Sequence, residues 1–259
     1  MAYKPPGPVF VPGMAATERT LTATQIHDEP QSGLVKTWSY STLKKFEACP
    51  HAVYLAKVAK LPVEQGDAAA RGEKIHLEGE RYIKAEDGDF PPAYNRYKPE
   101  LEALREGYAE GRVYAEDEWG FTTSYEPVAW KHPNVWLRMK LDCLELIDDT
   151  NARVVDFKTG RKFGNEMSHG QQLQLYALAT FTVHPAVEFI TTQAWYLDQN
   201  EGPLEQTYTR KEAMAFKDRW TLRATALTTA TNFPPRPSRN TCKFCDFKKS
   251  GACEWATNL

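Results

Sequence analysis

An apolar pair that leads into an acid and a lysine, Val154-Val155-Asp156-Phe157-Lys158, constrains the fold of this chain most strongly. The apolar residues predict a strand, and the Thr159-Gly160 pair that follows is typical of a turn. Because side chains alternate between the two faces of a strand, Asp156 and Lys158 project from the same face. The segment therefore predicts a strand end that presents a carboxylate beside an ammonium group.

A second acid, Asp142, lies one expected hairpin upstream in the segment Leu137–Asp142. Two acids and a lysine on adjacent strands suit the hydrolysis of a phosphodiester bond with a divalent metal. An isolated Asp-x-Lys tripeptide more often forms a weak, solvated ion pair. The interpretation therefore depends on what accompanies Asp156 and Lys158 elsewhere in the chain.

Length and composition indicate an ordinary globular protein. The chain has 259 residues, enough for one large domain or two small ones, with 42% hydrophobic and 25% charged residues. No apolar stretch is long enough to cross a bilayer, and no signal peptide is evident at the N-terminus. We therefore expect a cytoplasmic protein in a reducing environment.

The formal net charge of −2 does not by itself indicate a nucleic-acid-binding protein. An enzyme needs only a local basic groove, however, and metal-binding carboxylates add negative charge. Basic residues do cluster locally, in Arg161 and Lys162 after the Asp-x-Lys motif and again near the C-terminus, in Arg236, Arg239, Lys243, Lys248 and Lys249. Either cluster is equally explained as solvated surface.

The order of expected elements predicts a mixed α/β core with a helical N-terminal elaboration. Residues 1–36 are rich in proline and predict an extended, partly disordered arm before a single domain over 37–259. Helices are expected from near Ser39 and over 67–85, 99–111, 169–183 and 210–228; strands are expected over 122–129, 135–141, 143–147, 153–157 and 187–197. A proline-rich linker at 234–237 precedes a C-terminal segment of about 234–259.

Two expected helices carry further polar residues that could belong to a site. His76 lies on the 67–85 helix, where a neutral imidazole could bind an ion such as Mn²⁺. Gln172 and Tyr176 are four residues apart and so share one helix face, from which they could contact DNA backbone or order Lys158. The alternative makes Tyr176 a core residue and Gln172 a residue of the rim.

The five cysteines indicate a metal centre rather than disulfides. Cys242, Cys245 and Cys253 form a Cys-x2-Cys-x7-Cys pattern that lacks one soft ligand, and the distant Cys49 could supply it. Disulfides are the poorer explanation in a reducing cytosol. Four thiolates could bind zinc or an iron–sulfur cluster, and their spacing does not choose between the two. Cys143 lies in an expected strand and is most simply a buried small hydrophobe.

Taken in order, these motifs resemble RecB-like nucleases of the PD-(D/E)XK superfamily. The resemblance covers roughly residues 38–254 and rests on Trp38–Leu43, Phe46–Pro50, Gly72-x3-His76, Asp142, Asp156-x-Lys158 and Gln172-x3-Tyr176. The cysteines further resemble the iron–sulfur branch, which includes CRISPR-adaptation and AddB-type nucleases. The implied fold is a restriction-endonuclease-like core, a mixed central sheet flanked by helices, with a C-terminal cysteine cluster.

The resemblance also implies roles for residues. His76, Asp142 and Asp156 would bind Mg²⁺ or Mn²⁺, and Lys158 would orient or activate the attacking water. Gln172 and Tyr176 would be accessory catalytic residues. The four cysteines would hold a 4Fe-4S cluster: Cys49, Cys242, Cys245 and Cys253. The implied activity is a DNA exonuclease of phage or prokaryotic origin that serves DNA recombination or repair.

Two departures from the family pattern bear on cofactor and partner. The interval from Cys245 to Cys253 is longer than usual in the iron–sulfur branch, so zinc stays open. The chain has no Gly-x4-Gly-Lys-Ser/Thr phosphate loop, so a motor would come from a helicase or recombination partner. Two alternatives remain: a non-catalytic, zinc-stapled DNA-binding protein, and, ranked last, an iron–sulfur redox protein.

Overall fold

The computed structural model of the chain describes residues 33–62 and 66–256. Of the arm predicted over 1–36, positions 1–32 lie outside the described residues. Val35 lies in the main core, and the backbone N–H of Leu34 donates to the carbonyl oxygen of Ala230 at 3.2 Å. No helix among the described residues is both long enough and apolar enough to traverse a bilayer.

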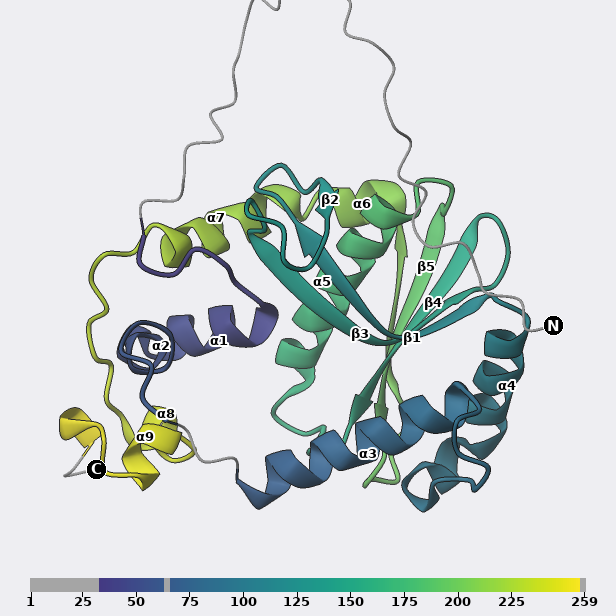
Figure 1. Cartoon of the computed structure of the whole chain (residues 1–259), viewed down its shortest axis with the longest axis horizontal. Helices are drawn as coiled ribbons and strands as arrows, with labels where there is room; N and C mark the ends of the chain where they lie inside the picture. The colour runs from purple at the N-terminus through teal and green to yellow at the C-terminus, as the bar shows by residue number, and fades with distance from the viewer. Residues whose placement is uncertain (1–32, 63–65, 257–259) are drawn as a thin grey trace, which may run out of the picture. The chain divides into compact units, whose positions relative to one another are not determined.

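A six-stranded mixed sheet in the order β2-β1-β3-β4-β5-β6 forms the centre (Figure 1). Its strands are β1 (Val113–Phe121), β2 (Pro127–Val128), β3 (Leu137–Leu146), β4 (Asn151–Lys158), β5 (Phe189–Tyr196) and β6 (Leu204–Thr209). Only β4 and β5 run parallel, and helix α5 (Glu166–Val183) connects them. A parallel pair requires such a crossover, so Asp156 and Lys158 come directly before the turn into α5.

The remaining helices cover the two faces of the sheet and one side of it (Figure 1). In chain order they are α1 (Tyr40–Ala48), α2 (Pro50–Val53), the π-helical turn η1 (Tyr54–Val58), α3 (Asp67–Ile83), the 3-10 turn η2 (Pro92–Tyr97), α4 (Lys98–Ala109), α6 (Arg210–Met214), α7 (Lys217–Thr228), α8 (Arg239–Cys242), α9 (Asp246–Lys249) and the 3-10 turn η3 (Glu254–Ala256). Pro50 starts α2 in the first turn, where its missing N–H is tolerated.

Two apolar layers hold the sheet between helices. One layer lies under α5 and α7 and includes Trp38, Leu173 and Trp220, all fully or nearly fully buried. The opposite layer lies under α3 and α4 and includes Ile75 and Phe157. α3 and α5 therefore cover opposite faces of the sheet.

The predicted α/β class and flanking helices are confirmed. The strand predicted over 122–129 is wrong except at Pro127–Val128; β1 lies before it at 113–121 and went unpredicted, as did β6. The two strands predicted over 135–141 and 143–147 are one strand, β3. It continues through Asp142 because the carboxylate accepts the backbone N–H of Phe157 at 2.6 Å, so the acid has a partner inside the sheet.

The long helix predicted over 210–228 is also wrong in one respect, because it divides into α6 and α7. Phe216 lies at the break and packs edge-on against Tyr208 of β6, with ring centroids 6.1 Å apart. A capping box at Thr209 and Glu212 starts α6 directly after β6. The tertiary position of Phe216 therefore overrides a helical pattern that is continuous in the sequence.

Candidate active site

Three acids lie in one row across three neighbouring strands. β1 and β3 pair on both sides of Glu116 in a constant register, which sets Glu116 opposite Asp142. The β3–β4 ladder ends at the Cys143–Val155 pair. One residue further along, the same register sets Asp142 opposite Asp156. Like charges placed directly opposite one another destabilise a sheet. The row is therefore a place where a bound cation would be stabilising.

The backbone of β1 is distorted at Glu116. This residue has a φ of 54°, in the left-handed region that a non-glycine residue rarely adopts. Before it, Val113 and Ala115 face the α3–α4 layer; after it, Trp119 and Phe121 face the α5 layer. The alternation of side chains thus shifts by one residue at Glu116. Backbone strain of this kind clusters at functional sites, where the surrounding structure maintains it.

His76 joins Glu116 and Asp142 to form a group that could hold a metal ion. One ligand atom from each residue lies within 4.8 Å of the others. The Nδ1 atom of His76 is 3.1 Å from one carboxylate oxygen of Asp142. The three side chains face a cavity of about 370 Å³, which Lys140 also lines. Carboxylate oxygens with one imidazole nitrogen suit Mg²⁺ or Mn²⁺.

The first turns of α3 are fixed against the sheet, and this positions His76. Arg71 donates two hydrogen bonds of 2.7 Å each to the carboxylate of Asp198, which follows β5. At Gly72 a β-carbon would lie 3.1 Å from the hydroxyl of Thr159, tighter than ordinary contact. Glycine therefore lets α3 approach the end of β4 closely, and His76 lies one turn further along the helix.

On the other side of the row, Asp156 and Lys158 belong to a closed ring of polar contacts. The ammonium group of Lys158 lies 2.5 Å from one oxygen of Asp156 and donates to the amide oxygen of Gln172 at 3.0 Å. The amide nitrogen of Gln172 donates to the hydroxyl of Tyr176 at 2.8 Å, and that hydroxyl lies 3.4 Å from the other oxygen of Asp156. The ring holds Lys158 in one orientation.

Burial and neighbouring charge shift the pKa of several site groups. Burial raises the pKa of Asp156; the charge of Lys158 opposes this rise and the charge of Asp142 adds to it. Burial likewise raises the pKa of Glu116, against the hydrogen bond from Lys140. For His76, burial acts to lower the pKa, but the hydrogen bond and charge of Asp142 raise it overall. These shifts follow from acids crowded in a poorly solvated place.

The structure brings together all six residues predicted for the catalytic site: His76, Asp142, Asp156, Lys158, Gln172 and Tyr176. Glu116 completes the acidic row and was not predicted from the sequence. It lies in the run Glu116-Asp117-Glu118, which is typical of a solvated loop. The apolar residues on either side of this run could have indicated a strand. Their alternation shifts by one residue at Glu116, however, so the strand pattern is not regular in the sequence.

The four cysteines predicted to bind one metal centre line one cavity of about 450 Å³. Cys49 lies between α1 and α2, while Cys242, Cys245 and Cys253 come from the C-terminal segment. Burial raises the pKa of Cys253. A backbone hydrogen bond opposes this rise, and the charges of the other three cysteines add to it. Cys143 is fully buried under α3 and α4, as predicted, and does not line this cavity.

A mixed sheet whose acids, lysine and crossover helix meet at one opening has the architecture of a metal-dependent nuclease. The chain matches the family model of the PD-(D/E)XK nuclease superfamily over residues 37–250. It therefore belongs to this superfamily, which makes it a nuclease of the hydrolytic kind; such nucleases typically use divalent metals such as Mg²⁺.

Two solved structures are similar to the chain. A protein named SSO0001 is 18% identical with a TM-score of 0.47, and the match covers 85% of this chain and 87% of that one. A protein from Eubacterium rectale, provisionally named an exonuclease, is 13% identical with a TM-score of 0.41, covering 87% and 92% of the respective chains. No curated protein sequence matches the chain.

The position of Glu116 leads to a prediction about metal affinity. Glu116→Gln keeps the shape of the side chain but removes one charge from the acidic row, so we expect divalent-metal affinity to fall at least about tenfold. Glu118→Gln is the matched control, because Glu118 is exposed on the same strand. Titration of each variant with Mn²⁺ in the absence of DNA measures the effect. Equal affinity of the two variants would show that Glu116 is not a ligand.

Proposed function

We propose that the chain is a divalent-metal-dependent deoxyribonuclease that acts as an exonuclease and belongs to the RecB-like, iron–sulfur branch of the superfamily. One observation carries the catalytic part: the acidic row and the Lys158 ring lie side by side and share Asp156. A cation-binding group beside an immobilised ammonium is the arrangement that phosphodiester hydrolysis needs.

His76, Glu116, Asp142 and Asp156 are the residues that would hold Mg²⁺ or Mn²⁺. The crowding of three carboxylates in one row, together with the raised pKa of Asp156 and of Glu116, supports a cation there. When bound, the cation polarises the phosphate and lowers the pKa of a water molecule. The nearby cavity gives the phosphate access to the row.

Lys158 has the central role among the chain's own groups. Its ammonium, held by Asp156 and Gln172, would hydrogen-bond the attacking water and offset the charge that grows on the phosphate oxygens. The water oxygen forms a bond to phosphorus, the bond to the leaving oxygen breaks, and the leaving oxygen takes up a proton. Gln172 and Tyr176 would be positioning residues, because they contact Lys158 and Asp156 rather than the substrate.

The cysteine cavity is proposed to hold a structural 4Fe-4S cluster, with zinc as the alternative. In a tetrahedral zinc site with Zn–S bonds of about 2.3 Å, the sulfur atoms lie about 3.8 Å apart. A four-iron cluster binds its thiolates at its outer corners, so its ligand sulfurs lie farther apart. The four cysteines line one cavity of about 450 Å³, which suits a single metal centre. The resemblance of the cysteine pattern to the iron–sulfur branch supports the cluster.

The enzymatic proposal is tested with end-labelled linear DNA, single- and double-stranded, and with circular single-stranded DNA as the control. We expect Mg²⁺ or Mn²⁺ to support degradation of linear DNA and EDTA to stop it. Circles should persist, because an exonuclease requires an end. An RNA oligonucleotide of the same sequence tests the preference for DNA.

Two outcomes would contradict parts of the proposal. Cleavage of circles at the same rate as linear DNA would make the protein an endonuclease. DNA binding without cleavage under any divalent metal would instead favour the non-catalytic DNA-binding alternative.

A further inference from the structure

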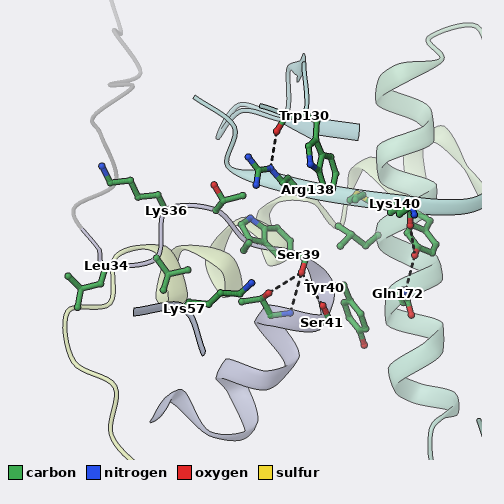
Figure 2. Close-up of a pocket in the computed structure, with 17 residues that line it drawn as sticks. Leu34, Lys36, Ser39, Tyr40, Ser41, Lys57, Trp130, Arg138, Lys140 and Gln172 are labelled. Atoms are coloured by element: carbon green, nitrogen blue, oxygen red, sulfur yellow. Dashed lines mark hydrogen bonds between the residues drawn. The ribbon is translucent and has the colours of Figure 1, made fainter. Parts of the chain in front are cut away.

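Figure 2 shows a groove of about 750 Å³. One side is the segment Leu34–Thr42, which runs into α1, and Lys57 of η1 lies close to it. Arg138 and Lys140 of β3, Trp130 before it, and Gln172 and Tyr176 of α5 complete the lining. Segments far apart in the sequence thus meet around one channel, and the catalytic proposal uses only Gln172 and Tyr176 of its lining.

The groove is strongly basic although the chain as a whole is slightly acidic. Lys36, Lys57 and Arg138 line it, together with Lys140, whose ammonium group pairs with Glu116 of the acidic row; no aspartate or glutamate is among its lining residues in the described part of the chain. The formal net charge of the chain is −2, so this concentration of cations is local. A basic groove of this kind tracks a phosphate backbone, and displaced counterions favour binding.

Trp130 and Arg138 form a fixed pair in the groove wall (Figure 2). The guanidinium carbon of Arg138 lies 5.2 Å from the centre of the Trp130 ring, and its Nε donates to the carbonyl oxygen of Trp130 at 2.9 Å. Both side chains are partly exposed. An aromatic ring beside a cation binds a nucleotide through stacking and charge together. Such stacking needs an accessible base face, which an unpaired base offers and an interior base of a duplex does not.

The groove adjoins the cavity in front of the acidic row. Lys140 lines both the groove and the cavity in front of His76, Glu116 and Asp142. At the same end, the hydroxyl of Tyr176 contacts both the carbonyl oxygen of Lys140 and the carboxylate of Asp156. A strand lying along the groove would therefore have its backbone led to the carboxylates.

We propose that this groove binds an unpaired DNA strand and leads it to the acidic row. Trp130 stacks a base, while Lys36, Lys57 and Arg138 pair with phosphates. The identity of the bond that is cut rests on the proposed nuclease function, whereas binding of the strand does not. The groove thus makes the substrate single-stranded DNA or the unpaired end of a duplex.

Binding is measured on the full chain in EDTA, by fluorescence anisotropy with a labelled single strand, a blunt duplex and a duplex with an unpaired tail. We expect the single strand and the tailed duplex to bind at least about tenfold more tightly than the blunt duplex. The double variant Lys36→Ala/Lys57→Ala should lower single-strand affinity and also the slope of log affinity against log salt, by about 0.7 for each lost phosphate contact.

Trp130→Ala should behave differently from the lysine variant. We expect a loss of about tenfold in single-strand affinity with an unchanged salt slope, because stacking involves no charge. Trp130→Phe should recover part of the loss. Lys211→Ala is the control for a lost surface charge, since Lys211 is exposed on α6 and does not line the groove.

The outcomes separate this proposal from the nuclease proposal. Loss of binding in the groove variants supports the groove, even if the wild-type protein cleaves nothing. A second result would be that the groove variants bind single strands as tightly as Lys211→Ala does and still cleave DNA with a metal. That result would overturn the groove proposal and leave the nuclease proposal standing. Binding of the blunt duplex as tight as that of the single strand would also overturn it.

Discussion

Lys158→Ala is expected to slow DNA cleavage by at least about 10²–10³-fold, the usual effect of removing one preorganised group that stabilises transition-state charge. The ammonium group is held 2.5 Å from Asp156 and 3.0 Å from Gln172, so no neighbouring side chain can replace it without breaking the ring. Single-turnover degradation of end-labelled linear DNA with Mn²⁺ measures the rate directly. Asp156→Asn should be impaired at least as strongly.

A stability control separates lost chemistry from a damaged fold. Removing Lys158 leaves the Asp156 carboxyl buried without its cation, and breaking such a pair costs up to about 3–5 kcal/mol. The double variant Asp156→Asn/Lys158→Met replaces the pair by neutral groups of similar size. We expect it to unfold at nearly the wild-type temperature yet to remain inactive. Undiminished cleavage by Lys158→Ala or by the double variant would refute the assigned role of Lys158.

The centre of the fold could be predicted from the sequence because its local patterns agree with its tertiary structure. The sequence has a clear pattern for strand β4, helix α5 and strand β5, and Thr159-Gly160 is typical of a turn. A parallel pair of strands joined by a helix is the simplest way to connect them. The errors lie where tertiary contacts override the local pattern. Asp142 inside β3 and Phe216 between α6 and α7 are the clearest examples.

The candidate site divides in the same way. Asp156, Lys158, Gln172 and Tyr176 stand close together in the sequence, so strand alternation and helix spacing predicted which of them could meet. Asp142 was a candidate because of the expected hairpin to Asp156, and His76 because it is a possible ligand on a helix. Their joint role in one metal site came from the resemblance to a family, because no local rule joins a helix at residue 76 to a strand at residue 142. Glu116 was missed because its alignment with Asp142 depends on the register between β1 and β3.

The basic groove could not have been predicted, since its lysines lie in three segments whose approach depends on the packing of α1 and η1 beside the sheet. Lys36 and Lys57 alone resemble any solvated surface lysine. Their meaning comes from sharing one lining with Trp130 and Arg138, which only the tertiary structure establishes.

Cys49→Ser is expected to prevent binding of the proposed metal cluster and to detach the C-terminal segment from α1 and α2. Cys49 is about 200 residues from Cys253, so a cluster that binds both closes nearly the whole domain into a loop. By the chain-entropy model developed for disulfides, a closure of this length stabilises the fold by at most about 5 kcal/mol. Protein purified without oxygen should be brown and contain iron and acid-labile sulfide for the wild type, and neither for the variant.

The stability loss should be smaller than this limit, because other contacts also hold the C-terminal segment. Phe247 is buried against Ala52 and Leu55, and Arg236 donates to the carbonyl oxygen of Glu47 at 3.0 Å. We therefore expect Cys49→Ser to keep its core and most of its helicity while residues after about 234 become sensitive to protease. Limited proteolysis followed by mass spectrometry locates the cut.

Cys143→Ala is the matched control, because it also removes one thiol but lies in the α3–α4 layer away from the cysteine cavity. It should retain iron and sulfide in wild-type amounts and lose only the packing of one sulfur atom. A colourless wild-type protein that contains one zinc would show that the cysteines bind zinc rather than an iron–sulfur cluster. Iron retained by Cys49→Ser would exclude Cys49 as a ligand. Neither result would bear on the nuclease site, because its side chains come from other segments.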